Sequence, residues 1–307
     1  MTGEKLKVIN QGKYDLIRSG RAGFYEHKRG LISVSGKEAV QFLDGMLTND
    51  MKTLEDGQQM LAAFPNAQGR LIAIVRVHRQ GDRFLFETEG ATREKVFQNL
   101  FRFTFAGDFF VEDLSDGHSY FEIFGPKEDI YHPNVAKRWP GAFVYELPYG
   151  AGYFMPTDLA RKFYDFLEPE NDCQVVNDEL YETLRIEAGI PKFGIDMDET
   201  TIVPELGFDE MISYNKGCYV GQEIIARIHF RGHVAKQLTG LVLSGPASVG
   251  ELTTNEGKPA GRMTSTTFSP KLRQNIAIGY VRFEHLNEGT QLDFEGGKAT
   301  VTELPFI

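Results

Sequence analysis

Cysteine is scarce in this chain, whose 307 residues include only two, Cys173 and Cys218. These lie far apart in the sequence, and no CxxC pair occurs. The sequence therefore offers neither a disulfide framework nor a complete zinc site, and we expect no bound metal ion. Unpaired cysteines are typical of a reducing compartment, so we expect a cytoplasmic protein.

Long apolar runs are also absent. The longest, such as Leu71 to Val75, have the length of a strand and fall far short of the ~20 residues that a membrane helix needs. The stretch from Met1 to Gly20 is polar and mixed in charge, unlike a secretory signal. We therefore expect no association with a membrane.

Positive charge is in deficit, since the formal net charge is -10. Nucleic-acid binding depends on a basic face that contacts phosphates, so we expect no direct nucleic-acid partner. The motifs GxxxxGK[ST], HExxH and GxSxG are missing. His229 and His233 have the spacing of helical metal ligands, but Gly232 between them argues against a helix there.

The apolar pattern is that of an α+β protein. Alternation predicts strands at residues 31–35, 60–64, 71–78, 83–88, 109–112 and 120–124. Helical spacing predicts helices at residues 92–101 and 157–167, and Ser35 with Glu38 has the spacing of a capping box that opens another helix. After about Gly232, turn residues separate short predicted strands, which is typical of a small antiparallel barrel or sandwich.

The segment Lys216-Gly217-Cys218-Tyr219-Val220-Gly221-Gln222-Glu223 combines features of a reactive thiol. Apolar residues at helical spacing predict a helix that begins near Gly221. A cysteine just before a helix N-terminus, with a lysine two residues away, lies where a thiolate is favoured. Cys218 is either such a ligand-facing thiolate or a small buried hydrophobic residue. Cys173, with no glycine or lysine nearby, fits the buried interpretation better.

The clearest predicted helix spans residues 178–189 and ends at Gly189, before Ile190-Pro191. Glu187 lies three residues after Leu184 and projects into the apolar side of this helix. A carboxylate in that position is costly unless it meets hydrogen-bond donors. The donors belong either to a bound ligand or to the chain itself, in an internal salt bridge or a backbone cap.

Other side chains of this helix have more than one interpretation. Tyr181 flanks the apolar side and is either an aromatic wall of a ligand site or part of the core. Glu182 and Arg185 are expected on the opposite, solvent-exposed side.

These residues resemble a known family. Residues 216–223 are similar to the signature of YgfZ-type proteins, relatives of the glycine-cleavage aminomethyltransferases. Residues 184–191, Leu-Arg-Ile-Glu-Ala-Gly-Ile-Pro, resemble the segment upstream of it. Shorter matches extend the resemblance over nearly the whole chain: Thr48-Asn49-Asp50, Gly69, Pro204-Glu205, Ile212-Ser213 and Gly261-Arg262-Met263-Thr264-Ser265.

The resemblance implies a fold and a ligand. The fold is α+β, three-lobed and aminomethyltransferase-like (GcvT-like), with a C-terminal antiparallel β-barrel. We place a folate-binding region of two interleaved lobes at residues 1–233 and the barrel at residues 234–307. The implied ligand is tetrahydrofolate or a one-carbon derivative of it.

The resemblance also assigns roles to residues. Glu187 is implied as a folate contact, with Tyr181 beside it. Arg227 either forms a solvated ion pair with Glu223, four residues earlier, or attracts the glutamate tail of folate. Cys218 and Lys216 are implied as the catalytic residues of the signature.

Two functions fit the family. An aminomethyltransferase is expected to carry an Asp in the strand after Gly69, but residues 70–75 read Arg-Leu-Ile-Ala-Ile-Val, and an Asn expected in the next strand is missing from residues 86–89. Proton transfer requires a titratable group within reach. The resemblance therefore favours a tetrahydrofolate-binding accessory protein in iron–sulfur cluster assembly or repair, supporting tRNA-modifying iron–sulfur enzymes.

One thiolate cannot hold a cluster that normally takes four ligands, so we expect transient iron–sulfur assembly or client proteins as partners. The alternatives are a folate-dependent aminomethyltransferase of one-carbon metabolism and the folate-binding module of an oxidase.

Overall fold

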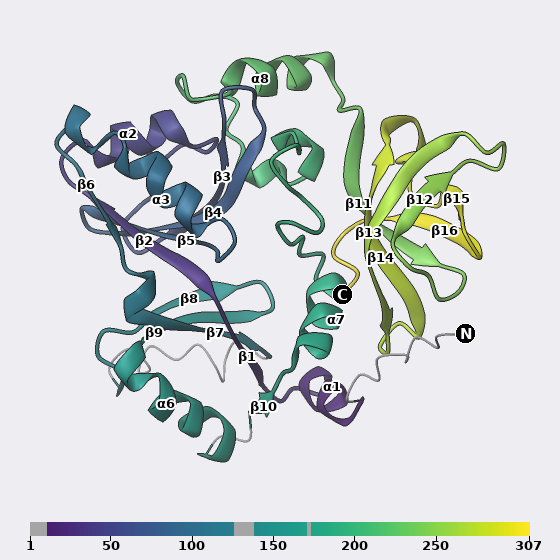
Figure 1. Cartoon of the computed structure of the whole chain (residues 1–307), viewed down its shortest axis with the longest axis horizontal. Coiled ribbons are helices and arrows are strands. Elements are labelled where there is room, and N and C mark those ends of the chain that lie inside the picture. The colour runs from purple at the N-terminus through teal and green to yellow at the C-terminus, as the bar shows by residue number, and fades with distance from the viewer. Residues whose placement is uncertain (1–10, 126–137, 171–172) are drawn as a thin grey trace. The chain divides into compact units, whose positions relative to one another are not determined.

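The computed structural model describes residues 11–125, 138–170 and 173–307 (Figure 1). The α-helices are α1 (Gln11–Arg18), α2 (Ala39–Met46), α3 (Arg93–Phe101), α6 (Thr157–Asp165), α7 (Asp178–Glu187) and α8 (Gln222–Arg231). None of the helices in these ranges combines the length and the apolar character needed to span a bilayer.

The strands form two open sheets and one closed barrel. Those before the barrel are β1 (Gly23–His27), β2 (Arg29–Ser35), β3 (Gln59–Pro65), β4 (Leu71–Gln80), β5 (Arg83–Glu89), β6 (Phe110–Asp113), β7 (His118–Phe124), β8 (Phe143–Leu147), β9 (Gly150–Pro156) and β10 (Gln174–Val175). The barrel strands are β11 (Lys236–Leu243), β12 (Gly250–Thr253), β13 (Pro259–Ser269), β14 (Gln274–Arg282), β15 (Gln291–Phe294) and β16 (Gly297–Thr302).

The described residues fall into two compact units, and each unit is built from two separate stretches of the chain. The first unit lies within residues 1–28 and 115–188, and the second within residues 29–114 and 189–307. The chain therefore leaves the first unit after β1 and returns to it before β7.

The first unit is a five-stranded sheet of order β10-β1-β7-β9-β8 with helices on both faces. Successive side chains of a strand point to opposite faces. On β7, Phe121 packs with Phe163 of α6 on one face, whereas Phe124 packs with α1 and α7 through Tyr14 and Leu180 on the other. This alternation places α7 against the sheet.

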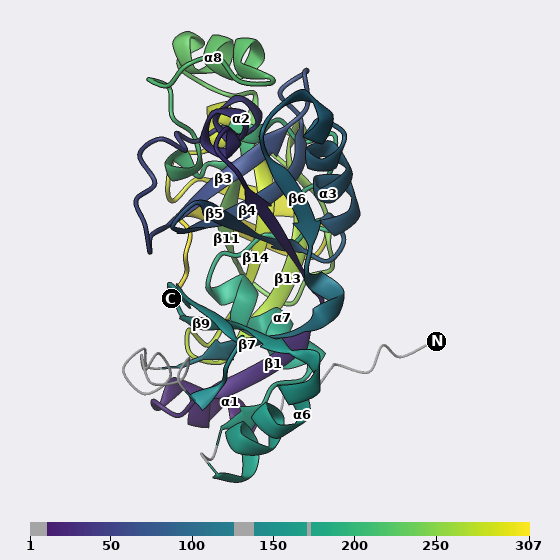
Figure 2. The same ribbon diagram turned by 90° about the vertical axis from the view of Figure 1, so that its left-hand side faces the viewer.

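The second unit begins with a five-stranded sheet of order β3-β4-β5-β2-β6. Helices α2 and α3 lie over one face of it (Figure 1, Figure 2). Leu43 of α2 and Leu100 of α3 are buried there with Val75 of β4 and Phe86 of β5. The core formed by these residues fixes the end of α2, which matters for the functional site.

The same unit ends in a closed barrel of order β11-β14-β13-β12-β15-β16, in which the pairings are antiparallel. Leu241, Leu252 and Val281 are among the apolar residues that fill its interior. The predicted α+β class with a C-terminal antiparallel barrel is confirmed.

Most predicted elements are present, but one local expectation was wrong. Ser35 ends β2 and does not cap α2, because the carboxylate of Glu38 accepts a hydrogen bond from the backbone N–H of Asp108 at 2.7 Å. The α2 N-terminus has no side-chain cap. Strands β1, β8, β9, β10 and β12 were not predicted from the sequence.

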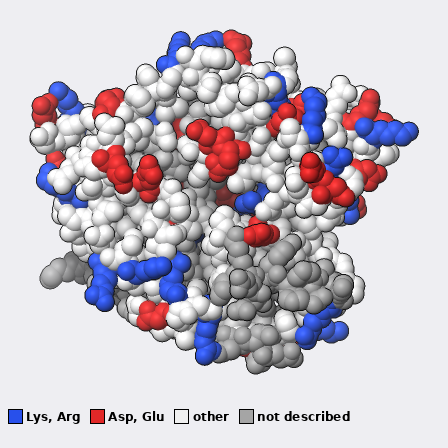
Figure 3. Space-filling model, turned by 180° about the vertical axis from the view of Figure 1, so that it is seen from behind, with Lys and Arg blue, Asp and Glu red and all other residues white. Residues whose placement is uncertain are grey.

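Charged side chains of both signs occupy the face of the molecule in Figure 3. They form several small groups, and on the described part of that face neither sign makes one continuous area. The excess negative charge of the sequence is thus spread out there.

Candidate functional site

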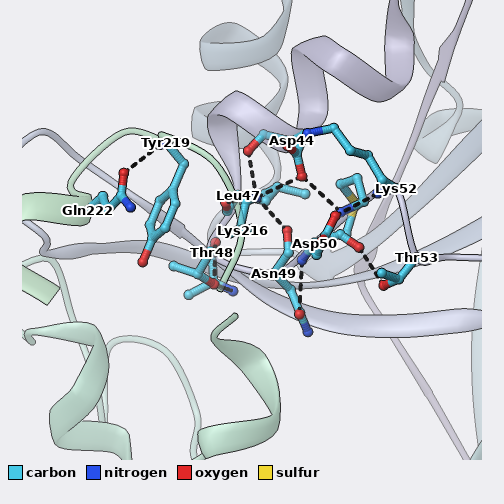
Figure 4. A network of polar contacts seen from close by, with 12 residues as sticks. Asp44, Leu47, Thr48, Asn49, Asp50, Lys52, Thr53, Lys216, Tyr219 and Gln222 are labelled. Atoms are coloured by element: carbon cyan, nitrogen blue, oxygen red, sulfur yellow. Dashed lines mark hydrogen bonds and ion pairs between the residues drawn. The ribbon is translucent and has the colours of Figure 1, made fainter. Parts of the chain in front are cut away.

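The signature lysine is a buried anchor in the second unit. The Lys216 side chain is fully buried, and its Nζ donates hydrogen bonds to the carbonyl oxygens of Asp44 at 2.6 Å, Leu47 at 3.0 Å and Asn49 at 2.7 Å (Figure 4). It also lies 3.1 Å from Oδ1 of Asp44. Because α2 ends at Met46, the ammonium caps carbonyls at and beyond the C-terminus of this helix, where positive charge is favoured.

Asp44 completes this anchor. Its Oδ2 accepts a hydrogen bond from Nζ of Lys52 at 2.7 Å, and its Oδ1 accepts one from the backbone N–H of Met51 at 3.2 Å. Burial alone raises the pKa of the Asp44 carboxyl, but the hydrogen bonds from Lys52 and Lys216 outweigh it and lower that pKa. The carboxylate is therefore held in its charged form.

The anchor occupies every donor of the lysine. Burial lowers the pKa of the Lys216 ammonium, and Asp44 opposes this effect. A buried lysine with a lowered pKa is a common catalytic group, yet the N–H groups of Lys216 face four protein oxygens. These contacts are structural, and the catalytic role of Lys216 stays a prediction.

Cys218 lies on the exposed turn that follows the anchor. Gly217 and Cys218 are exposed, whereas Tyr219 is buried with its ring centroid 5.1 Å from Nζ of Lys216. The backbone N–H of Val220 then donates to the carbonyl of Gly45 at 3.0 Å. The thiol is thus presented to solvent between two points that are both fixed to α2.

Gly221 ends this turn in a conformation that requires glycine. Its φ is +80°, and a Cβ atom there would lie 2.5 Å from the carbonyl oxygen of Asn66. Helix α8 begins at the next residue, as predicted. The turn therefore packs closely against the loop between β3 and β4.

Arg227 lies on the exposed side of α8. Its Nη2 is 2.7 Å from Oε1 of Glu223, and the two side chains are 49% and 84% exposed. This is the solvated pair that their spacing predicts, and a folate-tail role stays a prediction. Gly232 ends α8 with φ +87°, so His229 and His233 do not lie on one helix. The His229 ring stacks on Tyr214, and the His233 ring stacks on Phe283.

No group of three or more His, Cys, Asp or Glu side chains suited to a metal ion occurs within the described ranges. Cys173 lies in the core of the first unit, where burial raises the pKa of its thiol to about 12. The expected difference between the two cysteines is therefore present in the structure.

Glu187 lies at the end of α7, in the first unit. Asn177 caps this helix through a hydrogen bond from the backbone N–H of Leu180 to its side chain at 3.1 Å. Glu187 is fully buried, and its Oε1 accepts a hydrogen bond from the Tyr14 hydroxyl at 2.6 Å while its Oε2 pairs with Nη2 of Arg18. Burial and the bond to Glu187 raise the pKa of Tyr14 to about 12.

These contacts show which donors the chain itself offers to the Glu187 carboxylate. The side chain does face the apolar side of α7, as its spacing predicts. Of the two kinds of donor considered, the structure contains the internal one, a salt bridge from α1. The folate contact stays a prediction.

The remaining α7 side chains include one correction. Tyr181 is buried and stacks on Tyr25 at a ring-centroid distance of 4.2 Å, which is core packing, and its role as the wall of a ligand site stays a prediction. Arg185, expected on the exposed side, is only 1% exposed and pairs with Glu182 at 2.6 Å. The expectation for Arg185 was wrong because helical periodicity gives the direction of the Cβ atom and not the place where the end of a long side chain is buried; the paired Glu182 is still 34% exposed.

The structure brings Glu187 and Tyr181 together on one helix, and Lys216, Cys218 and Arg227 together on one segment of the other unit. The sequence analysis missed Tyr14, Arg18 and Asp44. Asp44 gave a weak signal, as a carboxylate within the otherwise apolar side of a short helix. Tyr14 and Arg18 gave none, because they lie about 170 positions from their partner.

Comparisons with known proteins identify the family. Residues 16–131 match the GCVT N-terminal domain, and residues 236–307 match the glycine cleavage T-protein C-terminal barrel domain. The chain belongs to the YgfZ/GcvT-like family. The family resemblance is thereby confirmed, but both matched ranges lie outside residues 184–191 and 216–223, so the roles of those two motifs stay predictions.

Named relatives cover most of the chain. The tRNA-modifying protein YgfZ of Klebsiella pneumoniae is 29% identical over 71% of this chain and 70% of its own length. The iron-sulfur cluster assembly factor IBA57 homolog, mitochondrial, of Mycosarcoma maydis is 27% identical over 69% of this chain and 55% of its own. Several bacterial aminomethyltransferases are also similar in sequence.

A solved structure confirms the fold. The glycine cleavage system aminomethyltransferase T from Bartonella henselae superposes with a TM-score of 0.84, covering 94% of this chain and 87% of its own. Its sequence identity is 22%, so the likeness concerns the fold alone. The GcvT-like prediction is confirmed at that level.

Proposed function

We propose that this chain is a tetrahydrofolate-binding accessory protein of iron–sulfur cluster assembly or repair, which also supports tRNA-modifying iron–sulfur enzymes. The observation that carries the proposal is the exposed thiol of Cys218 on a turn anchored by Lys216. The relatives named for tRNA modification and for iron–sulfur cluster assembly support it.

In this role Cys218 is a single ligand or nucleophile offered to a partner. An iron–sulfur cluster normally takes four protein ligands, so a transient assembly or client protein contributes the others. Lys216 acts by holding the turn in place, because its ammonium donates its hydrogen bonds to carbonyls at and beyond the end of α2. Cys173 is too deeply buried to take part. Free thiols suit the reducing cytoplasm, which we propose as the compartment.

Tetrahydrofolate is the proposed cofactor, bound by the part of the chain before residue 234, with the barrel from 234 to 307. Glu187 would accept hydrogen bonds from the pterin, Tyr181 would line the ring, and Arg227 would attract the glutamate tail. The Glu187 carboxylate already meets Tyr14 and Arg18. Because the Arg18 side chain is 26% exposed, it can turn outward and leave its place to the N–H groups of the pterin.

Two experiments test the proposal. Cells that carry Cys218→Ala should lose activity of iron–sulfur enzymes under oxidative stress, whereas Cys173→Ala cells, which lose only the buried thiol, should not. Equal activity in both strains would contradict the cluster role. Titration of tetrahydrofolate should show weaker binding to Glu187→Gln than to the matched α7 variant Glu179→Gln, and equal affinities would contradict the folate role of Glu187.

A folate-dependent aminomethyltransferase is the second candidate, favoured by the aminomethyltransferases among the relatives. The residues of β4 argue against it, since no Asp or Glu occurs from Leu71 to Gln80. The buried Glu87 of β5 is paired with Arg29 and Arg76, so it is not a free base. Turnover of a methylamine-bearing substrate with tetrahydrofolate by the purified protein would establish this activity.

A further inference from the structure

A cavity of about 320 Å³ lies in the second unit, outside the barrel and away from the Cys218 turn. The segment 195–201 forms one wall, and β11, β13 and β14 contribute most of the other. Its volume falls at the lower end of the range for small-molecule sites.

The strand register gathers cationic side chains on this wall. Arg262 of β13 is the register partner of Tyr280 on β14, and Arg282 of β14 is the partner of Lys236 on β11. Val281, between Tyr280 and Arg282, packs inside the barrel, so its two neighbours face outward. Three cations therefore surround one tyrosine on the outer face of adjacent strands.

Several donors on this wall lack acceptors. The Tyr280 hydroxyl is buried, and Tyr280 is only 8% exposed. Burial raises the pKa of Tyr280, and a hydrogen bond with the nearby Thr201 side chain opposes this, but that contact is too long or too bent to satisfy the hydroxyl among the described residues. Within the same described ranges, the guanidinium groups of Arg262 and Arg282 make no ion pair or side-chain hydrogen bond. A buried polar group without a partner marks a place that water or a ligand completes.

The acidic side chains of the cavity are largely committed elsewhere. Asp196 accepts hydrogen bonds from the hydroxyls of Thr264 at 2.5 Å and Ser265 at 2.6 Å. Asp198 accepts two from Thr200, through its backbone N–H at 2.7 Å and its hydroxyl at 2.6 Å. Both Thr200 bonds end on Oδ1, so Oδ2 of Asp198 and the exposed carboxylate of Glu251, the register partner of Arg262, remain as acceptors. The two guanidinium groups nevertheless supply more N–H donors than these carboxylate oxygens can take.

We propose that this cavity binds a small molecule through a single carboxylate. The carboxylate accepts a hydrogen bond from the Tyr280 hydroxyl and lies between the guanidinium groups of Arg262 and Arg282, whose planar forks match its two oxygens. A doubly charged phosphate fits less well, because Asp196, Asp198 and the exposed Glu251 also line the cavity and repel the second charge.

Lys236 contributes little further positive charge to the cavity, and this favours a ligand with one negative charge over a ligand with two. Its Nζ lies 4.8 Å from the Tyr280 ring centroid and 4.0 Å from Oε2 of Glu205, so its charge is already shared. The proposed contacts to the carboxylate come from barrel residues, and the test of this site is independent of the folate and cluster proposals.

Calorimetric titration of the full chain with sodium propionate, at constant ionic strength, tests the site. We expect saturable binding at one site per chain. Arg282→Gln and Arg262→Gln should each weaken binding about tenfold or more, as loss of a charge-assisted hydrogen bond does. The matched control is Lys298→Gln, which removes a barrel cation on β16 that does not line the cavity and should leave the affinity unchanged.

The variant Tyr280→Phe distinguishes an effect on ligand binding from an effect on the stability of the fold. Because the hydroxyl has no hydrogen bond of good geometry within the described residues, its removal should leave the Tm of the free protein unchanged or raise it, while propionate affinity falls several-fold. A lower Tm would reveal an internal partner for the hydroxyl and overturn its assignment to the ligand.

Other results would overturn the proposal as a whole. These are the absence of saturable binding, equal propionate affinity in Arg282→Gln and Lys298→Gln, or tighter binding of inorganic phosphate than of propionate. The last result would assign the cavity to phosphate-bearing ligands.

Discussion

Lys216 and Glu187 are both buried charged side chains within family motifs, but they leave different groups available. Lys216 is paired with α2, and the group that it supports, the thiol of Cys218, is exposed. Glu187 is itself the proposed binding group, and α1 already provides its partners. At the Cys218 turn the thiol is accessible without any rearrangement. At Glu187, a ligand that binds the carboxylate has to displace Tyr14 or Arg18.

The largest expected effect concerns the thiols. Under native conditions at pH 7.5, a maleimide should modify Cys218 roughly a thousand times faster than Cys173. Burial raises the pKa of Cys173 to about 12, which lowers its thiolate fraction about a thousandfold below that of an ordinary cysteine. Mass spectrometry of peptides after timed quenching measures both rates, and similar rates would show that Cys218 is not exposed.

The next effect tests the anchor. Lys216→Met keeps much of the side-chain volume but leaves three carbonyls without this donor and removes one of the two cations paired with Asp44, so the free energy of unfolding should fall by about 3–5 kcal/mol. Urea denaturation measures this loss. Lys52→Met removes the exposed partner of Asp44 and serves as the control, with little change expected. A small loss for Lys216→Met would reopen a catalytic role.

A smaller effect is expected at the Glu187 site. Arg18→Met should lower the free energy of unfolding by about 2 kcal/mol, less than a fully buried pair, because Arg18 is partly exposed. The same variant should bind tetrahydrofolate more tightly if the pterin replaces the guanidinium. Arg161→Met, which breaks an exposed pair with Asp165, should change stability by less than about 0.5 kcal/mol. Weaker folate binding to Arg18→Met would mean that Arg18 is itself a ligand contact.

The smallest effect concerns acid stability. The folded pKa of Asp44 is lowered, so its contribution is fully present above the unfolded pKa near 4 and is lost as the pH falls through the folded value. Asp44→Asn should be less stable at neutral pH and should lose less further stability between pH 5 and 2. Urea midpoints across this range measure the slope, and parallel curves for the two proteins would contradict the assignment.

Local patterns predicted elements well where one face of an element is apolar. The helix at residues 178–189 and the turn into α8 at Gly221 were visible in the sequence, because capping residues and glycine act within a few positions. The Ser35–Glu38 capping box failed because Glu38 bonds instead to Asp108, 70 positions away. Arg185 was misplaced because helical periodicity gives the direction of its Cβ atom but not where the end of the long side chain is buried.

The sequence by itself determined the family, the α+β class with its barrel, and the positions of the cysteine and glutamate motifs, because these depend on local composition and short spacings. Only the tertiary structure decided that Lys216 is an anchor, that Arg18 and Tyr14 hold Glu187, and that Arg262, Tyr280 and Arg282 share a cavity. The physical reason is that burial and charge pairing are properties of residues distant in the chain. Their energies depend on which donors and acceptors the fold places within hydrogen-bond distance.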